Sequence, residues 1–151
     1  MAAEGMVHAL SLIHELLKPG GFLIDLHPGK EKPEFSVLFP DGSRFVGHLE
    51  ETDDFVEYAQ AQSALERVVS DGLYRLEHAG EFPFVSHAAR FAEMEAFLAE
   101  NWKDAVLTSA LRAEAAAAFR LPGAQEIQLV ERVAIARLRR VDQGAPKSMV
   151  K

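Results

Sequence analysis

Asp25 and His27 are the residues whose types and place in the chain best suit chemistry, because they end an apolar run at residues 22–27. Such a run is typical of a strand that is covered on both faces. Open α/β sheets bind ligands at the carboxyl ends of such strands. The reference pKa of histidine lies near neutrality, which suits His27 to act as a base toward a hydroxyl or an amine. We predict Asp25 and His27 as candidate catalytic residues; the alternative is two polar residues satisfied at a strand end.

The remaining histidines give no metal-binding signature. Neither H-x-x-x-H nor H-E-x-x-H occurs, and His14-Glu15 lacks the second histidine four residues later. His27, His48 and His78 could still meet across a sheet and bind a metal. Scattered surface histidines are the simpler interpretation, so we predict no metal site.

Two charged clusters have simpler explanations than a binding site. The acidic cluster consists of Glu50, Glu51, Asp53 and Asp54. It could coordinate a cation or neutralise an amine, but carboxylates at the start of a helix explain it without a function. The basic stripe consists of Arg132, Arg137, Arg139 and Arg140. In an acidic chain we expect these arginines to pair with nearby carboxylates rather than with phosphate.

Aromatic residues in the second half of the chain could line an apolar pocket for a small ligand. They are Phe82, Phe84, Phe91, Phe97 and Trp102. Aromatic side chains at such spacing more often belong to the core. We therefore predict a core role for them.

The composition excludes several classes of protein. The chain of 151 residues has no cysteine, which excludes disulfides and thiolate sites and favours a reducing cytoplasm. Its 16 Lys and Arg against 23 Asp and Glu give a net charge of −7, which argues against binding to duplex nucleic acid. No apolar run approaches the roughly 18 residues of a membrane span, and no signal peptide begins the chain. We predict one cytoplasmic domain, residues 1–142, followed by a polar tail, residues 143–151, that is disordered.

The stretch before Asp25 predicts a helix, a tight turn and a strand. Apolar residues recur at helical spacing over residues 4–17. Pro19 ends the helix, because proline has no N–H and disfavours helix for the residue before it. Pro19 and Gly20 fit the centre of a type II turn, in which glycine takes a positive φ.

The rest of the chain alternates between helical and extended patterns. Residues 35–39 and 44–49 flank Asp41-Gly42 and predict a β-hairpin. Helices are predicted from a cap at residues 52–54 to Ser70, over residues 91–102 with a cap at Ser86, and over residues 107–119. Strands are predicted at residues 73–78 and 82–85, with a turn or bulge at Gly80, and at residues 127–141, where the alternation changes phase near Glu131.

The segment HELLKPGGFLIDLHP resembles the segment of class I S-adenosylmethionine-dependent methyltransferases that joins the helix after the fourth strand to the fifth strand. The later segments GEFPF, FAEMEAFLAENW and ARLRRV follow in the order that the family shows, and the resemblance covers residues 5–141. It implies an α/β fold: the C-terminal half of a Rossmann-like methyltransferase sheet, mixed parallel and antiparallel, with flanking helices and an added β-hairpin. It also implies that strand 127–141 lies between strand 22–27 and strand 73–85, with the last two strands antiparallel.

The glycine-rich loop with which that family binds its cofactor has no counterpart in this sequence. Gly-x-Gly spacing occurs nowhere, and the adjacent glycines Gly20 and Gly21 belong to the turn. Without that loop no backbone cradle is arranged for the methionine and adenosine parts of the cofactor. We therefore expect no cofactor for the isolated chain, and S-adenosylmethionine only when a complementary half is supplied.

Two interpretations from different classes remain. In the first, the chain is a methyltransferase-like module that is not catalytic alone and acts as a non-catalytic partner or as part of a split enzyme. In the second, it is an independent α+β domain that binds a small molecule. The first leaves one side of strand 22–27 without a neighbour and exposes an apolar stripe on the preceding helix, formed by Met6, Leu10, Ile13 and Leu17. A homodimer that buries this region, by strand pairing or by helix packing, is the expected partner arrangement.

Overall fold

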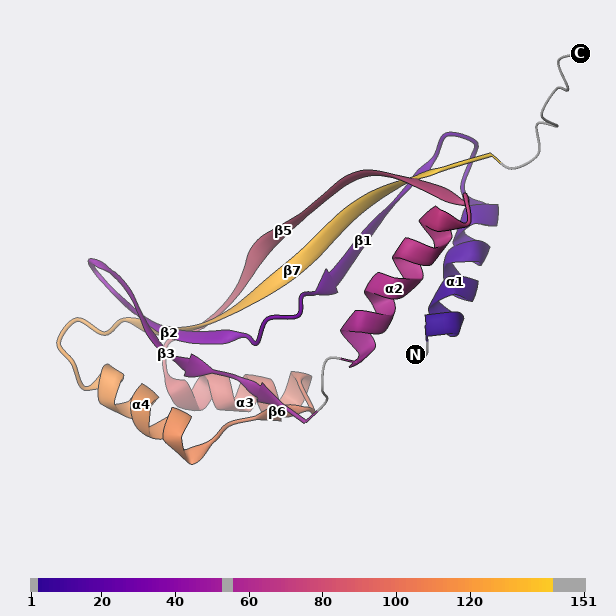
Figure 1. The fold of residues 1–151 in the computed structure, drawn as a ribbon. Coiled ribbons are helices and arrows are strands. Elements are labelled where there is room, and N and C mark those ends of the chain that lie inside the picture. Colours follow the sequence, from indigo (N-terminus) through magenta and orange to yellow (C-terminus); the bar gives the residue numbers. More distant parts are fainter. Residues whose placement is uncertain (1–2, 53–55, 143–151) are drawn as a thin grey trace, which may run out of the picture. The chain divides into compact units, whose positions relative to one another are not determined.

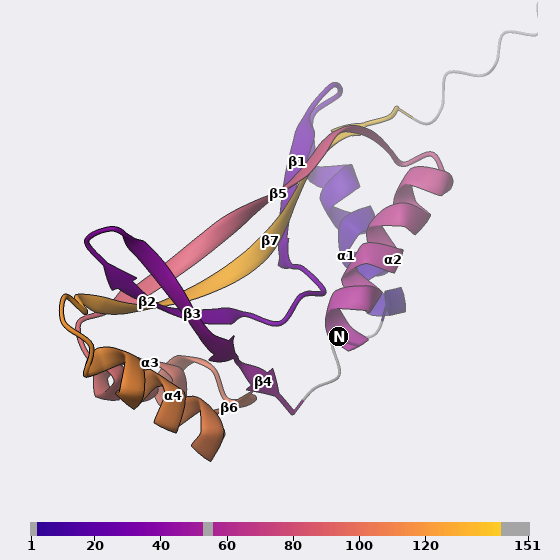
Figure 2. The same cartoon turned by 60° about the vertical axis from the view of Figure 1, so that its left-hand side comes forward.

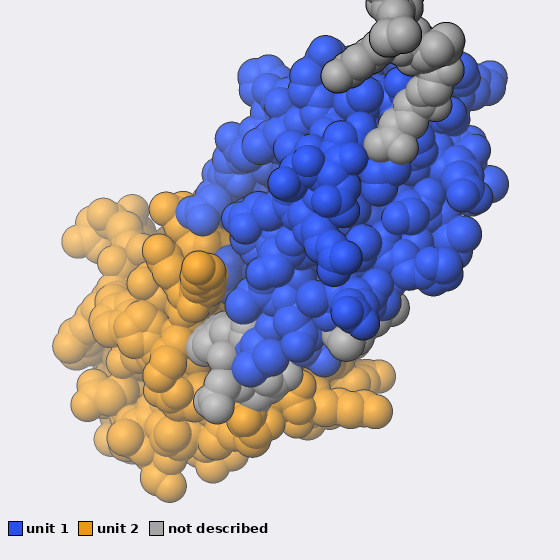
Figure 3. Space-filling view, turned by 45° about the vertical axis from the view of Figure 1, so that its right-hand side comes forward, with its two compact units in different colours: residues 1–29, 55–82, 133–151 blue, residues 30–54, 83–132 orange. Residues whose placement is uncertain are grey.

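The computed structural model describes residues 3–52 and 56–142 of the chain. Over these residues it is a mixed α/β protein with four helices and a mostly antiparallel sheet. The chain divides into two compact units, coloured in Figure 3: unit 1 holds residues 1–29, 55–82 and 133–151, and unit 2 holds residues 30–54 and 83–132. The single domain over residues 1–142 stays a prediction, and the predicted tail lies outside the described residues.

Unit 1 begins as the sequence predicts. Helix α1 spans Ala3–Leu16, and strand β1 spans Phe22–Pro28. Gly20 has a φ of 74°, and the backbone N–H of Gly21 donates a hydrogen bond to the carbonyl oxygen of Lys18 at 2.8 Å. The predicted turn with Gly20 at positive φ is therefore confirmed.

Helix α2 and strand β5 follow in unit 1, and β5 differs from the prediction. Helix α2 spans Val56–Ser70 and ends at Gly72, which has a φ of 79°. Strand β5 spans Tyr74–Ala88 without a break, so a turn at Gly80 is wrong, as is the helix cap at Ser86, whereas the alternative of a bulge at Gly80 stays a prediction. Pairing with β7 keeps the backbone extended through Gly80, which is not among the glycines with positive φ.

Strand β7, Glu126–Arg140, lies between β1 and β5 in unit 1. It pairs antiparallel with β1 from Phe22 opposite Arg139 to Pro28 opposite Val133. The N–H of Val141, just after β7, donates to the carbonyl of Leu73, just before β5, at 2.9 Å. The start of β5 therefore lies beside the end of β7, so these two strands also run antiparallel. The predicted order of the three strands is confirmed (Figure 1).

Helices α1 and α2 lie side by side and cover one face of these three strands (Figures 1 and 2). The core between them is built on the buried side chains of Leu65, Val68, Tyr74 and Leu138. Leu10 and Leu17 of the predicted apolar stripe pack against this core, and Met6 and Ile13 are half-buried. The expectation that this stripe is exposed is wrong, because α2 and the sheet cover it.

Unit 2 is an α+β unit built on a β-hairpin. Strands β2, Glu34–Phe39, and β3, Gly42–His48, form the predicted hairpin, with Gly42 at a φ of 143°. Strand β2 also pairs antiparallel with β7, up to Glu34 opposite Val130. The short strands β4, Glu50–Glu51, and β6, Ala105–Val106, pair separately.

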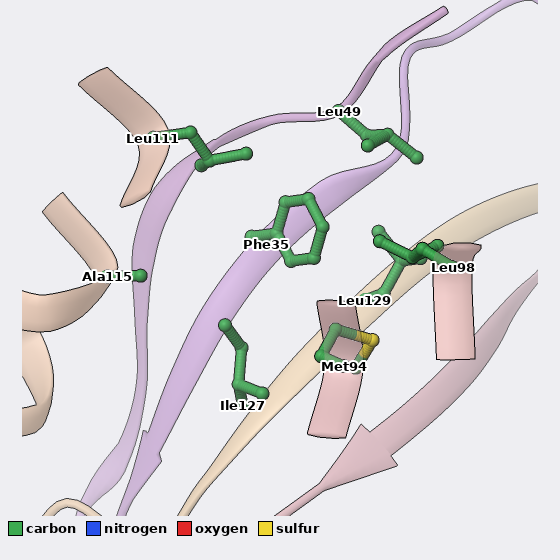
Figure 4. Close-up of a cluster of buried hydrophobic side chains, with 8 residues drawn as sticks. All are labelled: Phe35, Leu49, Met94, Leu98, Leu111, Ala115, Ile127 and Leu129. Atoms are coloured by element: carbon green, nitrogen blue, oxygen red, sulfur yellow. The ribbon is translucent and has the colours of Figure 1, made fainter. Parts of the chain in front are cut away.

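Helices α3, Phe91–Asn101, and α4, Ser109–Phe119, complete unit 2. The Thr108 side chain caps α4 by accepting a hydrogen bond from the N–H of Leu111 at 3.1 Å. Figure 4 shows Met94 and Leu98 of α3 and Leu111 and Ala115 of α4 on either side of Phe35. Leu49, Ile127 and Leu129 complete this core, which is separate from the core of unit 1.

Strand β7 places odd-numbered residues in the core of unit 2 and even-numbered residues in the core of unit 1. This explains why the alternation of apolar and polar residues changes phase along the strand. Ile127 and Leu129, at odd positions, are buried in unit 2, whereas Ala136 and Leu138, at even positions, pack in unit 1. Residues 131–132 lie between the part of β7 that pairs with β2 and the part that pairs with β1. The predicted change of phase near Glu131 thus falls where the strand passes from one unit to the other.

Candidate functional site

Asp25 and His27 contact each other on β1. Oδ2 of Asp25 lies 2.5 Å from Nδ1 of His27, and the two side chains are 23% and 13% exposed. Both share a side of the strand with Leu23, which packs against the core under α1 and α2. Ile24, between Leu23 and Asp25, is half-exposed on the opposite side. The structure thus brings together the two residues that the sequence predicts as catalytic.

The contact sets the roles that the two side chains can take. An ionised carboxylate can only accept a hydrogen bond, so beside an ionised Asp25 the Nδ1–H of His27 donates to Oδ2 of Asp25. Nε2 of the ring is then the nitrogen with a free lone pair, the tautomer in which histidine acts as a base. Among the described residues, His27 has no hydrogen-bond partner besides Asp25.

The neighbouring strand presents two alanines opposite this pair. Ala136 lies opposite Asp25, and Ala134 lies opposite His27. A base with a free Nε2 is one interpretation of the arrangement. The same contact also satisfies both polar groups at a strand end, as the simpler interpretation predicts.

The other histidines form no metal centre in the part of the chain that the structure describes. No group of three His, Cys, Asp or Glu side chains lies close enough to hold a metal ion within residues 3–52 and 56–142. His27 and His78 belong to unit 1, whereas His48 belongs to unit 2 and stacks against Phe45 with 5.1 Å between ring centroids. A site shared by these three histidines is therefore not supported.

Glu50 and Glu51 do not begin a helix, so the explanation of the acidic cluster as a helix start is wrong for them. They form β4, whose backbone pairs with Val106 and Ala105. The carboxylate of Glu50 also pairs with the ammonium group of Lys32 at 2.7 Å. Asp53 and Asp54, the other two members of the cluster, lie outside the described residues.

The aromatic residues only partly follow the predicted core role. Phe91 and Trp102 pack against the core of unit 2. Phe84 and Phe97 are exposed, and Phe82 is half-buried. An open depression of about 390 Å³ lies elsewhere in unit 2, and none of its lining residues was predicted as a site. It is lined by Phe39, Asp41, Gly42, Ser43, Arg44, Leu121 and Pro122.

The basic stripe pairs with carboxylates, as predicted. Glu77 lies 3.0 Å from Arg137 and 2.7 Å from Arg139. The hydrogen bond from Arg139 is the main cause that holds the pKa of Glu77 below its ordinary value. Arg132 pairs with Glu31 at 3.9 Å, and Arg140 pairs with Asp142 at 3.1 Å. The guanidinium groups are thus engaged within the chain.

Comparison with protein-family models, with curated proteins and with solved structures finds no match for this chain.

No helix among the described residues is long and apolar enough to cross a membrane.

Two histidines to which the sequence analysis assigned no role, His14 and His87, make defined contacts in the structure. His14 is buried, and its Nε2 lies 2.8 Å from the carbonyl oxygen of Val141. Its ring meets Tyr74 edge-on, and the Tyr74 hydroxyl donates to the carbonyl of Leu10 at 2.6 Å. Helical spacing places His14 on the same face as Leu10 and Leu17, and this is the signal that indicates burial.

His87 is the second of these histidines. It lies 2.7 Å from the carboxylate of Glu126, which also accepts a hydrogen bond from Gln128 at 3.0 Å. These contacts join β5 to β7 within unit 2. The hydrogen bonds from Gln128 and then His87 lower the pKa of Glu126.

Glu131 on β7 is expected to destabilise the folded chain when it ionises. Burial raises its pKa above the ordinary value of 4.5, and the nearby Glu51 carboxylate raises it further. The folded state therefore binds a proton more tightly than the unfolded state, and stability is lost as pH rises through the folded pKa. Glu131→Gln should raise the melting temperature at pH 7, with a gain that disappears below about pH 4, as thermal unfolding followed across this pH range will measure.

Glu126→Gln on the same strand is the matched control. The pKa of Glu126 is lowered in the folded state, so its contribution to stability is present above its unfolded pKa and lost as pH falls. This variant should have a lower melting temperature than the wild type at pH 7. A Glu131→Gln variant whose melting temperature follows the wild type at every pH would contradict the prediction.

Proposed function

We propose that this chain is a methyltransferase-like module without the cofactor-binding half, and that it is not catalytic alone. The observation that carries the proposal is the strand order of unit 1. Strand β7 lies between β1 and β5 and runs antiparallel to both, so β1 and β5 run in the same direction. This is the order that the resemblance to class I S-adenosylmethionine-dependent methyltransferases implies for the C-terminal half of their sheet.

Two further features of unit 1 support the same proposal. The turn at Lys18–Gly21 leads directly from α1 into β1, with Gly20 at a φ of 74°. Helices α1 and α2, which precede and follow β1, cover the same face of the sheet (Figure 2). A Rossmann-like sheet would continue on the free side of β1, and that continuation is what the complementary half would add.

Asp25 and His27 have a defined role in this proposal. They lie toward the carboxyl end of β1, the end at which open α/β sheets bind ligands. With a complementary half that supplies S-adenosylmethionine, Nε2 of His27 would remove a proton from the methyl acceptor, and Asp25 would orient the ring. Without that half the chain serves as a non-catalytic partner. Both roles need a second polypeptide.

The expected result is that the isolated chain does not bind S-adenosylmethionine usefully, because no glycine-rich loop is present to hold it. Isothermal titration calorimetry measures this directly, with a complete class I methyltransferase titrated in parallel as the positive control. A dissociation constant below about 100 μM, or roughly −5.5 kcal/mol, would overturn the proposal. Binding that needs a second polypeptide bearing the loop would support the split enzyme.

An independent small-molecule-binding domain is the second candidate, and the depression in unit 2 favours it. Arg44, Asp41 and Ser43 offer charged and hydroxyl groups there beside the apolar side chains of Phe39 and Leu121. Nuclear magnetic resonance titration with small carboxylates and amines distinguishes the candidates. Saturable shifts confined to these residues would favour the second candidate.

A further inference from the structure

The hydrogen-bonding pattern of β1 fixes which of its backbone groups face outward. The N–H of Arg140 donates to the carbonyl of Gly21 at 2.9 Å, in the register that pairs Phe22 with Arg139. Hydrogen-bonded and non-hydrogen-bonded pairs alternate along an antiparallel ladder. Odd positions of β1 therefore bond to β7, and the N–H and C=O groups of Phe22, Ile24 and Leu26 point away from it.

The same residues present an apolar row on the exposed face of the strand. Among the described residues β1 pairs with β7 alone, so its outer edge has no strand beside it. The side chains of Phe22, Ile24 and Leu26 are 46%, 46% and 57% exposed. Edge strands are usually protected by charges, bulges or proline. Among the even-numbered residues of β1 the one such device is Pro28. At these positions the backbone N–H would face outward, and proline has no N–H.

We propose that β1 pairs antiparallel with β1 of a second copy of this chain, with Ile24 on the two-fold axis. In this register Ile24 lies opposite its symmetry mate, and Phe22 lies opposite Leu26 of the other copy. All three pairs fall at the outward-facing positions, so each exchanges two N–H···O=C hydrogen bonds. The apolar row continues across the axis, and both copies use the same patch, as a two-fold interface requires.

Neighbouring registers are less favourable. An axis at Asp25 places two carboxylates in the close, non-hydrogen-bonded pair at the centre, where like charges destabilise a sheet. An axis at Leu23 places Leu26 opposite Gly20 of the other copy, which lies outside β1. The outward-facing N–H and C=O groups of Leu26 would then have no strand partner. With Ile24 on the axis, Asp25 lies opposite Leu23 of the other copy and keeps its contact with His27.

The surroundings of the row are compatible with a second copy. Arg137 and Arg139 lie one strand inward, where Glu77 pairs with both and the ring of Phe22 lies 4.2 Å from the Arg137 guanidinium group. Leu10 and Leu17 of the stripe predicted on α1 pack against the core of unit 1, whereas Leu12 and Leu16 of the same helix are 47% and 85% exposed. Self-pairing uses the same free side of β1 that a complementary half would occupy, so the two arrangements exclude each other at this edge. The proposal rests on the geometry of β1 and not on the methyltransferase assignment.

Light scattering coupled to size exclusion, on the full chain at micromolar concentration, tests the dimer. The expected mass is twice the chain mass of 16.7 kDa. Ile24→Lys places two like charges at the axis and should raise the dimer dissociation constant at least about tenfold. Leu76→Lys is the matched control, because Leu76 is 49% exposed on β5 in the same unit but away from the β1 edge. It should remain dimeric.

A charge pair tests the register. Phe22→Glu and Leu26→Lys should each weaken the dimer, and the double variant should restore it, because positions 22 and 26 face each other across the axis. A monomeric wild type would overturn the proposal, as would an Ile24→Lys variant that stays dimeric or a Leu76→Lys variant that dissociates equally. A double variant that is weaker than both single variants would overturn the register. A wild type that associates only with a different polypeptide would also overturn the self-pairing.

Discussion

Phe35→Ala is expected to lower the free energy of unfolding by about 3–5 kcal/mol, the usual cost of removing a buried phenylalanine side chain. Phe35 is fully buried at the centre of the unit 2 core, between α3 and α4 (Figure 4). Its ring meets Phe91 at 6.4 Å between centroids. The strands and helices around it cannot close on the space, because their backbones are held by sheet and helix hydrogen bonds.

Urea unfolding followed by the fluorescence of Trp102 measures this loss. Trp102 is the single tryptophan of the chain and packs against the same core. Phe45→Ala is the control, since Phe45 is 54% exposed on the neighbouring strand β3. An exposed substitution of this kind changes stability by about 0.5 kcal/mol or less. Equal losses for the two variants would contradict the assignment of Phe35 to the core.

The sequence predicts the local elements well where one residue type dictates the backbone. Gly20 and Gly42 take positive φ at the two predicted turns, and Gly72 ends α2 as expected. Gly80 shows the limit of this reasoning, because glycine tolerates an extended backbone as readily as a turn. Long-range pairing with β7 decides between the two, and periodicity over a few residues does not contain that information.

The candidate site shows the same division between local and distant contacts. Asp25 and His27 are two positions apart on one strand, so a strand prediction alone places them together. The contact between His14 and Val141 joins residues 127 positions apart, and His87 meets Glu126 across two strands. Such contacts depend on the register of the paired strands. A slip of one residue would turn every side chain of a strand to the opposite face of the sheet.

Leu138→Ala in unit 1 is expected to lower the free energy of unfolding by about 2–5 kcal/mol. Leu138 is buried and packs against α1 and α2 from the central strand of unit 1. Leu76→Ala on β5 is the control, because Leu76 is half-exposed. The control variant should unfold at nearly the same urea concentration as the wild type.

The urea transition of this variant, followed by Trp102 fluorescence, shows whether the two units unfold together. Strands β5 and β7 each run from one unit into the other, so the loss of packing at Leu138 is expected to destabilise the strands that unit 2 also uses. The Trp102 transition, which reports on unit 2, should therefore shift to lower urea in Leu138→Ala. This is the behaviour of the single domain that the sequence predicts. A Trp102 transition that stays at the wild-type position, while circular dichroism shows the helices of unit 1 melting earlier, would mean that the units unfold independently.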